Sequence, residues 1–397
     1  MTVDQKEQTD DVTEEDVLEA LSNVQDPDLG KDIVSLGFVD DLRICGGQVA
    51  FTINLTTPAC PVKDKMENEA REFVGQLPGV ETVNITMDSD TQGRSSGGPA
   101  AAAAGGQASE EEQQGEDFDA LSDVKNIVAV ASGKGGVGKS TVAANIALSL
   151  ARDGASVGLM DADLYGPSIP TMFGIEDEKP SATDDKKIVP IEKHGIHTIS
   201  IGLLQQEDDD APTIWRGPIA TNMIKQFLSG VVWGELDYLI IDLPPGTGDI
   251  QLTLTQTAPL TGGVITTTPQ NVSLIDARKG LKMFQKVNVP ILGIVENMSQ
   301  FVCPNCEEVH HIFRKGGGSR TAEEFDVELL GEIPIDSTIA EGMDEGRPFL
   351  VDNPESNAAK SFIDVGRNVA ARLSTLHLAE EQEDKTADSF SIEWSES

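Results

Sequence analysis

The sequence predicts an α/β protein with a large, doubly wound and mostly parallel sheet, preceded by a small α/β domain. Two observations support this prediction. Short, continuous apolar runs recur along the C-terminal part of the chain, and helical patterns fall between or after them. Strands that are covered by helices on both faces have this composition, and strands that alternate with helices form parallel sheets. In addition, a stretch of linker-like composition separates this part from the N-terminal one.

The expected strands of the large domain are residues 127–131, 157–160, 238–241, 263–266 and 291–295. The expected helices are residues 139–151, 273–285 and 358–373. Because the strand runs are too short for helices and lack polar alternation, they indicate a sheet that is buried on both faces.

The N-terminal part has the pattern of a small α/β unit. Thr13 and Asp16 have the spacing of a capping box, which predicts a helix that begins there. Gly46-Gly47 separates two alternating runs, 38–44 and 49–55, and so predicts a hairpin. A helix over 63–77 and a strand over 80–87 are expected to follow.

Composition divides the chain into four segments. We expect the small α/β domain at residues 1–90, a disordered linker at 91–120, the large domain at 121–378 and an acidic disordered tail at 379–397. The linker has consecutive alanines at 100–104 between Gly-rich and Glu/Gln-rich stretches. Such a composition buries too little apolar surface to offset its ordering entropy.

The charge and cysteine content restrict the function. The 397 residues include 29 Lys and Arg against 67 Asp and Glu, a formal net charge of −38. A surface this negative repels nucleic acids and anionic membranes, so neither is an expected partner. The acidic residues are spread along the chain, which favours a halophile's protein over an acidic binding tail. Four cysteines, no signal-peptide pattern and no bilayer-length apolar run predict a cytoplasmic location.

A phosphate-binding loop follows the first expected strand. It reads Gly133-Lys134-Gly135-Gly136-Val137-Gly138-Lys139-Ser140, continues with Thr141, and matches G-x-x-x-x-G-K-[ST] between a strand and a helix. Glycines let the backbone wrap around phosphates, and N–H groups at the helix start supply positive potential. Lys139 is expected to reach the β- and γ-phosphates of ATP, and Ser140 to bind Mg²⁺.

Carboxylates follow two of the expected strands. Asp161 and Asp163 end one strand and Asp242 ends another, so all three are expected at the carboxyl edge of the sheet. A carboxylate that faces a phosphate-binding loop from a strand end is the usual partner of Mg²⁺ and its waters, which makes Asp242 a magnesium candidate. Gly246 lies in the loop after Asp242, where its N–H group could contact the γ-phosphate.

The second lysine of the loop, Lys134, makes it resemble the deviant Walker A loop of the MinD/ParA/nitrogenase-reductase superclass of P-loop ATPases. This resemblance implies that Lys134 reaches across a homodimer to the other subunit's nucleotide. It also implies that Asp163 positions the attacking water, that Asp161 supports the Mg²⁺ shell, and that Asn297 contacts adenine.

A cysteine pair, Cys303-Pro304-Asn305-Cys306, lies just beyond Asn297. From the residues alone, it is half of a zinc site, a redox pair or half of a shared cluster. Zinc and iron–sulfur clusters both need four ligands. His310-His311 leave an intrachain zinc site open, and a reduced structural pair is a third alternative. In a two-fold dimer, two copies of the pair would supply four thiolates for one bridging cluster.

Several motifs together resemble the Mrp/ApbC family of iron–sulfur carrier ATPases over roughly residues 125–373. They are residues 160–168, Trp215-Arg216-Gly217-Pro218, 242–249, 267–270, and 297–299 followed by the cysteine pair. The resemblance implies slow hydrolysis of Mg·ATP by a homodimer. It also implies that Cys303 and Cys306 hold a labile [4Fe–4S] cluster, which is passed to apo iron–sulfur proteins.

The N-terminal domain resembles the small iron–sulfur-assembly domain that is often fused to this ATPase, through residues 26–29, 33–37 and 55–61. In that domain the cysteine of T-P-A-C-P is the suspected reactive thiol, so Cys60 is a candidate contact for clusters or targets. A buried structural cysteine is the alternative, and Cys45 matches no motif.

The main competing function is a MinD/ParA-like positioning or regulatory switch with a structural zinc at the cysteine pair. Membrane-bound switches of that class need a basic amphipathic helix, for which the acidic residues 380–384 are unsuited. A redox ATPase like nitrogenase reductase is a second competitor, but its cluster cysteines are separated in sequence, unlike the pair here.

Overall fold

The computed structural model describes residues 12–27, 29–45, 47–55, 62–80, 82–89, 119–204 and 217–388. The chain divides into two compact units, Met1–Gln92 with Ala370–Ser397, and Gly93–Val369. Cys60, Trp215, Arg216 and nearly all of the expected linker lie outside the described residues.

The small unit is built on a three-stranded sheet. Strand β3 (Val39–Cys45) pairs antiparallel with β4 (Gln48–Leu55), and β4 pairs parallel with β5 (Thr82–Ser89). The other elements are α1 (Glu14–Leu21), β1 (Gln25–Asp26), β2 (Lys31–Asp32) and α2 (Lys63–Gly75). The predicted hairpin is confirmed, and so is the capping box, since the Thr13 and Asp16 side chains each accept from the other's backbone N–H.

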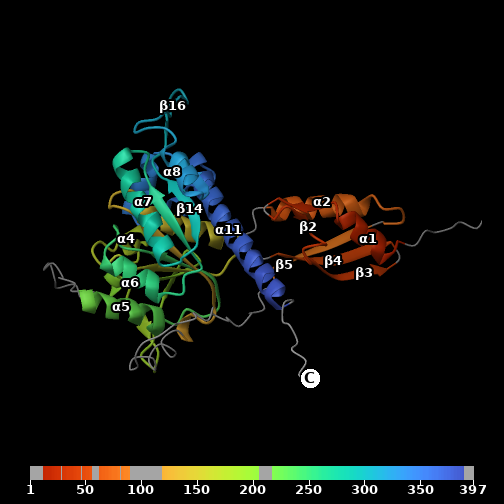
Figure 1. The fold of residues 1–397 in the computed structure, drawn as a ribbon, viewed down its shortest axis with the longest axis horizontal. Coiled ribbons are helices and arrows are strands. Elements are labelled where there is room, and N and C mark those ends of the chain that lie inside the picture. Colours follow the sequence, from red (N-terminus) through yellow and green to blue (C-terminus); the bar gives the residue numbers. More distant parts are fainter. Residues whose placement is uncertain are drawn as a thin grey trace, which may run out of the picture. The chain divides into compact units, whose positions relative to one another are not determined.

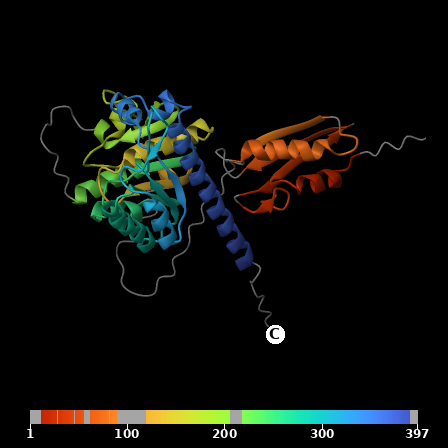
Figure 2. The same ribbon diagram turned by 90° about the horizontal axis from the view of Figure 1, so that it is seen from above.

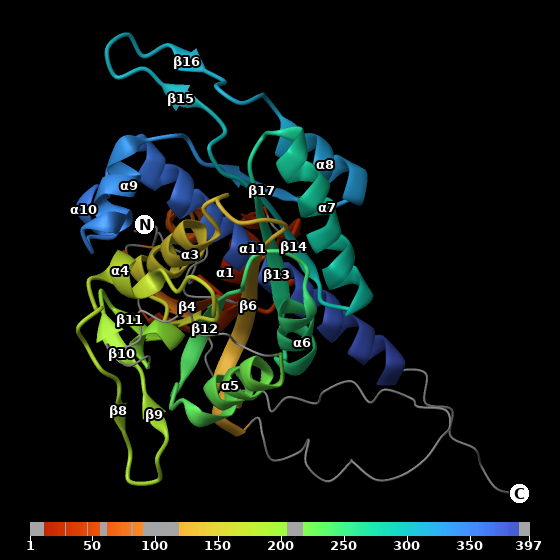
Figure 3. The same ribbon diagram turned by 90° about the vertical axis from the view of Figure 1, so that its left-hand side faces the viewer.

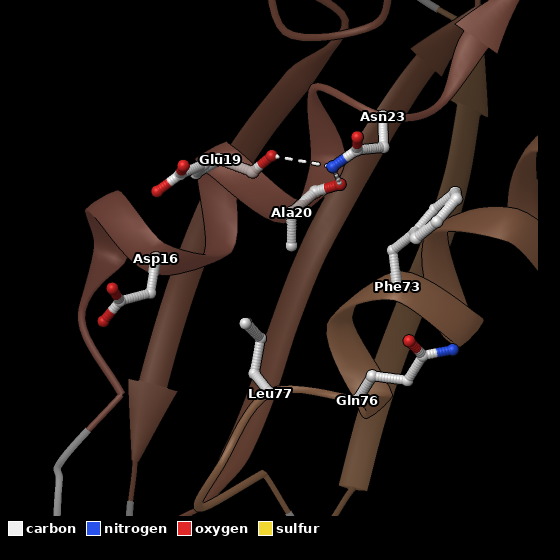
Figure 4. A pocket seen from close by; sticks show the side chains of 7 residues that line it. All are labelled: Asp16, Glu19, Ala20, Asn23, Phe73, Gln76 and Leu77. Atoms are coloured by element: carbon white, nitrogen blue, oxygen red, sulfur yellow. Dashed lines mark hydrogen bonds between the residues drawn. The ribbon is translucent and has the colours of Figure 1, made fainter.

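Helices α1 and α2 contact each other, and a shallow pocket of about 270 Å³ lies between them. Its lining residues are Asp16, Glu19, Ala20, Asn23, Phe73, Gln76 and Leu77 (Figure 4). Several polar groups of this pocket form helix-end hydrogen bonds. Asp16 accepts from Thr13, and Asn23 Nδ2 donates to the carbonyl oxygens of Glu19 and Ala20.

The large unit contains an eight-stranded sheet in the order β10-β11-β7-β12-β6-β13-β14-β17, and Figure 3 labels these strands except β7. Its strands are β6 (Val124–Ser132), β7 (Val157–Asp161), β10 (Ile191–Lys193), β11 (Ile196–Ser200), β12 (Leu236–Asp242), β13 (Gly262–Thr267), β14 (Ile291–Glu296) and β17 (Leu329–Glu332). All neighbours are parallel except β10 and β11. The predicted fold class is confirmed, and all five predicted strands lie in this sheet.

Helices cover both faces of the sheet. Alternate residues of β6, such as Ile127 and Ala129, share a core with Phe227 of α5 (Gly217–Gly230) and Phe284 of α7 (Asn271–Lys286). Helix α6 (Asp249–Thr257) joins this core through Leu254. Side chains alternate along a strand, so the other residues of β6 face the opposite side, where α3 (Lys139–Arg152) packs.

The remaining elements are short, apart from the last helix. They are α4 (Ile169–Phe173), β8 (Ser181–Ala182), β9 (Ile188–Val189), β15 (Phe301–Val302), β16 (Val309–His310), α8 (Gly317–Phe325), α9 (Ser337–Asp344), α10 (Phe349–Asp352), and the 3₁₀ turns at Asp119–Leu121 and Ile201–Leu203. Helix α11 (Asn357–Asp388) runs beyond the predicted end at residue 373 and into the expected tail (Figure 2). Within the described parts of the chain, no helix is long and apolar enough to cross a membrane.

Helix α11 approaches α3 closely at one glycine. A Cβ atom on Gly366 would lie 2.4 Å from Ser149 Oγ and 2.7 Å from Ser149 Cβ. Gly366→Ala should therefore destabilise the large unit by about 1–3 kcal/mol, although alanine is intrinsically the better helix former. Thermal or urea unfolding measures this change.

Ser149→Gly provides the matched test of that contact. In the double variant Ser149→Gly/Gly366→Ala, the added methyl group has space. The decrease in the free energy of unfolding should therefore be smaller than the sum of the decreases in the two single variants. Strictly additive decreases in the free energy of unfolding would show that the contact with Ser149 is not what destabilises Gly366→Ala.

Candidate nucleotide site and cysteine hairpin

The phosphate-binding loop connects β6 to α3. Helix α3 begins at Lys139 and has Gly138 as its N-cap, with a φ of +80° that favours glycine. A Cβ atom on Gly138 would lie 2.2 Å from Asn297 Nδ2, so this position has no space for a side chain. Among the described residues, no side chain caps α3, which leaves its first N–H groups available to an anion.

The start of the loop is equally confined. A Cβ atom on Gly133 would lie 2.1 Å from the carbonyl carbon of Asp276 in α7. The loop backbone is therefore packed directly against the backbone of α7. Gly135 and Gly136 are exposed, whereas Lys134 is half-buried.

Lys139 lies between two carboxylates. Its Nζ is 2.5 Å from Asp242 Oδ1 and 3.6 Å from Asp163 Oδ2, and it also donates to Ser140 Oγ at 3.3 Å. Asp242 is fully buried, and its Oδ2 atom has no hydrogen-bond partner among the described residues. Burial raises the pKa of Asp242, and the Lys139 ammonium opposes that effect. The predicted lysine, serine and strand-end carboxylates are thus brought together.

Asp161 is fully buried beside this group, in register with Asp242 on the neighbouring strand. Its Oδ1 accepts from the backbone N–H of Asp163, and its Oδ2 accepts from Ser200 Oγ at 2.9 Å and from the N–H of Ile169 at 3.3 Å. Both carboxylate oxygens are therefore occupied by protein donors. Burial, together with the charge of Asp242, raises the pKa of Asp161 to about 7.

Gly246 lies beside the loop with a φ of +97°. Its N–H group donates to the carbonyl oxygen of Ser132 at 3.0 Å. The predicted contact of this N–H with a γ-phosphate would thus require this hydrogen bond to break.

Asn297 follows β14 and contacts the phosphate-binding loop. Its Nδ2 donates to the carbonyl oxygen of Val137 at 2.9 Å, and its Oδ1 accepts from the N–H of Met298 at 2.9 Å. The side chain is 7% exposed. The structure therefore places Asn297 against the loop backbone, with one hydrogen bond on each end of its amide.

The cysteine pair forms the turn between β15 and β16, a hairpin that projects from the large unit (Figures 1 and 3). Cys303 is half-buried, and Cys306 is exposed. The pKa of the Cys303 thiol is lowered, first by the backbone N–H groups of Asn305 and Cys306, which donate to its sulfur. Two backbone donors aimed at one sulfur favour a thiolate, which is the form that binds metals.

The histidines do not complete a metal site with these cysteines. His311 Nδ1 lies 3.4 Å from the Ser299 carbonyl oxygen, and His310 Nε2 lies 3.8 Å from Glu308 Oε2. Within the ranges that the structure describes, no group of three or more His, Cys, Asp or Glu residues is placed to hold a metal ion. On one chain, the pair offers two thiol ligands.

Two residues that adjoin the site were not indicated by any sequence pattern used above. Ser200 contacts Asp161 from β11, a strand that the sequence did not predict. Glu296 is 1% exposed and accepts from the N–H of Gly318 at the start of α8. A signal for Glu296 was present, because it ends an apolar strand in the same way as Asp161 and Asp242.

Two family models match the chain. The model described as "NUBPL iron-transfer P-loop NTPase" matches residues 123–370, and the model described as "Iron-sulfur cluster assembly protein" matches residues 14–86. The iron-sulfur cluster carrier protein of Synechocystis is 45% identical over 367 residues, covering 91% of this chain and 98% of that protein. The protein of the same name from Deinococcus radiodurans is 46% identical over 364 residues, covering 92% and 97%.

A solved structure is similar to the large unit. It is a nucleotide-binding protein from Archaeoglobus fulgidus in complex with ADP, with a TM-score of 0.55 and 40% sequence identity. The match covers 63% of this chain and 97% of that chain.

The raised pKa of Asp161 gives the large unit a pH-dependent stability. Between 3.8, the ordinary pKa of aspartate, and about 7, the folded chain holds a proton that the unfolded chain has lost. The contribution of this group to the free energy of unfolding therefore falls as pH rises through that window. Asp161→Asn removes this dependence but also loses an acceptor, so we expect it to melt below the wild type at pH 5, with a smaller difference at pH 8.

Asp344→Asn, at an exposed aspartate of α9, is the matched control for this prediction. Its melting temperature relative to the wild type should be the same at both pH values. An equally constant difference for Asp161→Asn would contradict the assigned titration.

Proposed function

The chain belongs to the NUBPL iron-transfer P-loop NTPase family, and on this premise we propose that it is an ATP-dependent carrier of iron–sulfur clusters. In this proposal, Mg·ATP binds at the phosphate-binding loop, and Cys303 and Cys306 hold a [4Fe–4S] cluster that is passed to apo-proteins. One observation carries the proposal. Asn297 contacts the loop carbonyl of Val137 and lies on the segment that leads directly into the cysteine hairpin.

The loop residues fit a nucleoside triphosphate. The first N–H groups of α3, which no described side chain caps, and the Lys139 ammonium provide positive charge for phosphate oxygens. When phosphate is bound, Lys139 would exchange its contacts with Asp242 and Asp163 for contacts with the phosphates. The ADP complex of the Archaeoglobus fulgidus protein supports a nucleotide as the ligand.

The acidic residues fit Mg²⁺. The buried Oδ2 of Asp242, which no described residue hydrogen-bonds, is an oxygen ligand of the kind that Mg²⁺ or its waters require, and the Ser140 hydroxyl lies at the start of α3. Mg²⁺ would neutralise charge on the β- and γ-phosphates. Asp163 would orient the attacking water. Asp161 would act indirectly, because its carboxylate holds the N–H of Asp163 in place.

The cysteine pair fits an iron–sulfur cluster as cargo. A cluster of this type is usually held by four thiolates, and two copies of the pair in a homodimer would supply them. The exposure of Cys306 supports access for a second copy and for a cluster. The lowered pKa of the Cys303 thiol supports the thiolate form that would bind the cluster. In such a dimer, Lys134 would reach the nucleotide of the other subunit. The names of the Synechocystis and Deinococcus radiodurans relatives support the carrier role.

The small unit would serve the same process. Residues 14–86 match the iron–sulfur cluster assembly model, and Cys60 is the thiol that we propose to contact clusters or recipient proteins.

Lys139→Ala tests the nucleotide site. Loss of a charge-assisted contact to phosphate should weaken ATP binding by at least about tenfold and abolish cluster transfer. Binding of a fluorescent ATP analogue measures the first effect. Lys282→Ala, at an exposed lysine of α7, is the control and should bind like the wild type. Wild-type ATPase activity in Lys139→Ala would refute the assignment of the phosphate site.

Anaerobic reconstitution with iron and sulfide tests the cargo. The wild type should gain an iron-dependent visible absorbance and elute at the mass of two chains, because the cluster bridges two copies. Cys303→Ser and Cys306→Ser should each lose the absorbance, and Cys45→Ser should keep it. Stoichiometric zinc without that absorbance would instead support a structural zinc in a regulatory switch.

A further inference from the structure

The segment that carries the cysteine pair is anchored at both ends to the same strand end. We call residues 299–316 the cysteine arm. The arm departs after Asn297 and Met298, which follow β14, and it returns at Gly316 to the start of α8 (Figure 3). Between these ends, only the short pair β15–β16 is formed, and this hairpin projects from the unit (Figure 1).

The departing end is held by backbone contacts. The N–H of Asn297 donates to the Thr267 carbonyl oxygen at 2.8 Å, and the N–H of Ser299 donates to the Ile333 carbonyl oxygen at 2.9 Å. Between them, Met298 has a φ of +56°, a left-handed conformation that is uncommon for methionine. The chain therefore turns sharply into the arm directly after the residue that contacts Val137.

The returning end is packed closely and is also hydrogen-bonded to one buried side chain. Gly316 has a φ of +66° and leads into α8, and the N–H of Gly318 donates to Glu296 Oε2. A Cβ atom on Gly318 would lie 3.0 Å from Glu296 Cβ, so the helix start is packed against this side chain. Gly317 is equally confined, since a Cβ atom there would lie 2.8 Å from Leu274 Cδ1.

Glu296 thus connects three segments: the residue after β17, the start of α8 and, through Asn297, the phosphate-binding loop. Its carbonyl oxygen accepts from the N–H of Ile333 at 2.9 Å, its carboxylate holds Gly318, and its chain neighbour Asn297 contacts the phosphate-binding loop. The carboxylate is buried, which raises its pKa, and the N–H of Gly318 acts in the opposite direction. A buried carboxylate needs such donors, so this contact is costly to break.

We propose that Glu296 is a positioning residue that transmits occupancy of the nucleotide site to the cysteine arm. The proposal rests on the proposed function, because it takes the loop as the nucleotide site and the arm as the cargo site. A movement of the loop backbone at Val137 would displace Asn297 and, with it, Glu296. Because its carboxylate accepts from the N–H of Gly318, Glu296 would displace the returning end of the arm together with the departing end. Without the carboxylate, the contact that joins the start of α8 to the end of β14 would be lost, and the returning end would follow the movement less.

The reactivity of the arm cysteines tests this proposal without any cluster. The full-length chain, free of iron and sulfide, is alkylated with iodoacetamide with and without Mg·ATP, and mass spectrometry follows the peptide that contains Cys303 and Cys306. In the wild type, Mg·ATP should change the alkylation rate by at least about fivefold, the lower range of allosteric coupling. In Glu296→Ala, the change should fall below about twofold, while ATP binding stays close to that of the wild type.

Two variants separate positioning from mere stability. Glu296→Gln keeps an oxygen acceptor for the N–H of Gly318 and should restore most of the response to Mg·ATP. Glu323→Ala removes an exposed glutamate of α8 itself, and it should respond like the wild type. Hydrogen exchange at residues 316–321 should show a nucleotide-dependent change in the wild type and in Glu296→Gln but not in Glu296→Ala.

The outcomes distinguish this inference from the proposed function. If the wild type does not bind ATP, the proposed function itself is wrong. If ATP binds and Glu296→Ala responds as strongly as the wild type, or if the wild type shows no response, the role of Glu296 is refuted while the nucleotide site stands.

Discussion

The contact on which the nucleotide site depends is the one between the Lys139 ammonium and the Asp242 carboxylate. Both groups are almost completely removed from water, and such burial costs several kcal/mol per ion unless an opposite charge is close. Asp242 lies 2.5 Å away, and Asp163 adds a weaker contact. A bound phosphate therefore has to compete with carboxylates for the same ammonium. In the proposed function, this competition would give the site two arrangements, one with and one without bound phosphate, as a nucleotide-dependent switch requires.

The overall charge of the chain has little influence on this chemistry. A net charge of −38 should repel a nucleotide at long range, but exposed charges are screened over about 10 Å in ordinary salt. Within the site, the groups that can attract phosphate are the N–H groups at the start of α3 and the Lys139 ammonium, which Asp242 and Asp163 also contact. Backbone amides are fixed by the fold and do not depend on surface composition. An acidic surface and a polyanion site can therefore coexist on one chain.

The central strands and the phosphate-binding loop could be predicted because each has a local signal. A strand buried on both faces is continuously apolar, and the loop has its glycines and lysine at fixed spacing. Two outer strands gave no such signal: β11 has polar His197 and Thr198 among its isoleucines, and β17 is short and contains a glycine. Ser200 was missed together with β11. Its contact with Asp161 exists only because β11 lies beside β7 in the sheet, and no sequence spacing encodes that neighbourhood.

Parallel strands explain why one sheet edge holds both the nucleotide site and the root of the cysteine arm. Their carboxyl ends all meet at that edge, in the order β7, β12, β6, β13, β14. Asp161, Asp242 and the phosphate-binding loop therefore come first, and Glu296 follows two strands further out from the loop. The same feature, a carboxylate at the end of an apolar strand, has different chemistry at each position. Next to Lys139 it faces a cation, whereas at β14 it faces the backbone of α8. Sequence alone shows the shared feature, and the order of the strands decides what each carboxylate does.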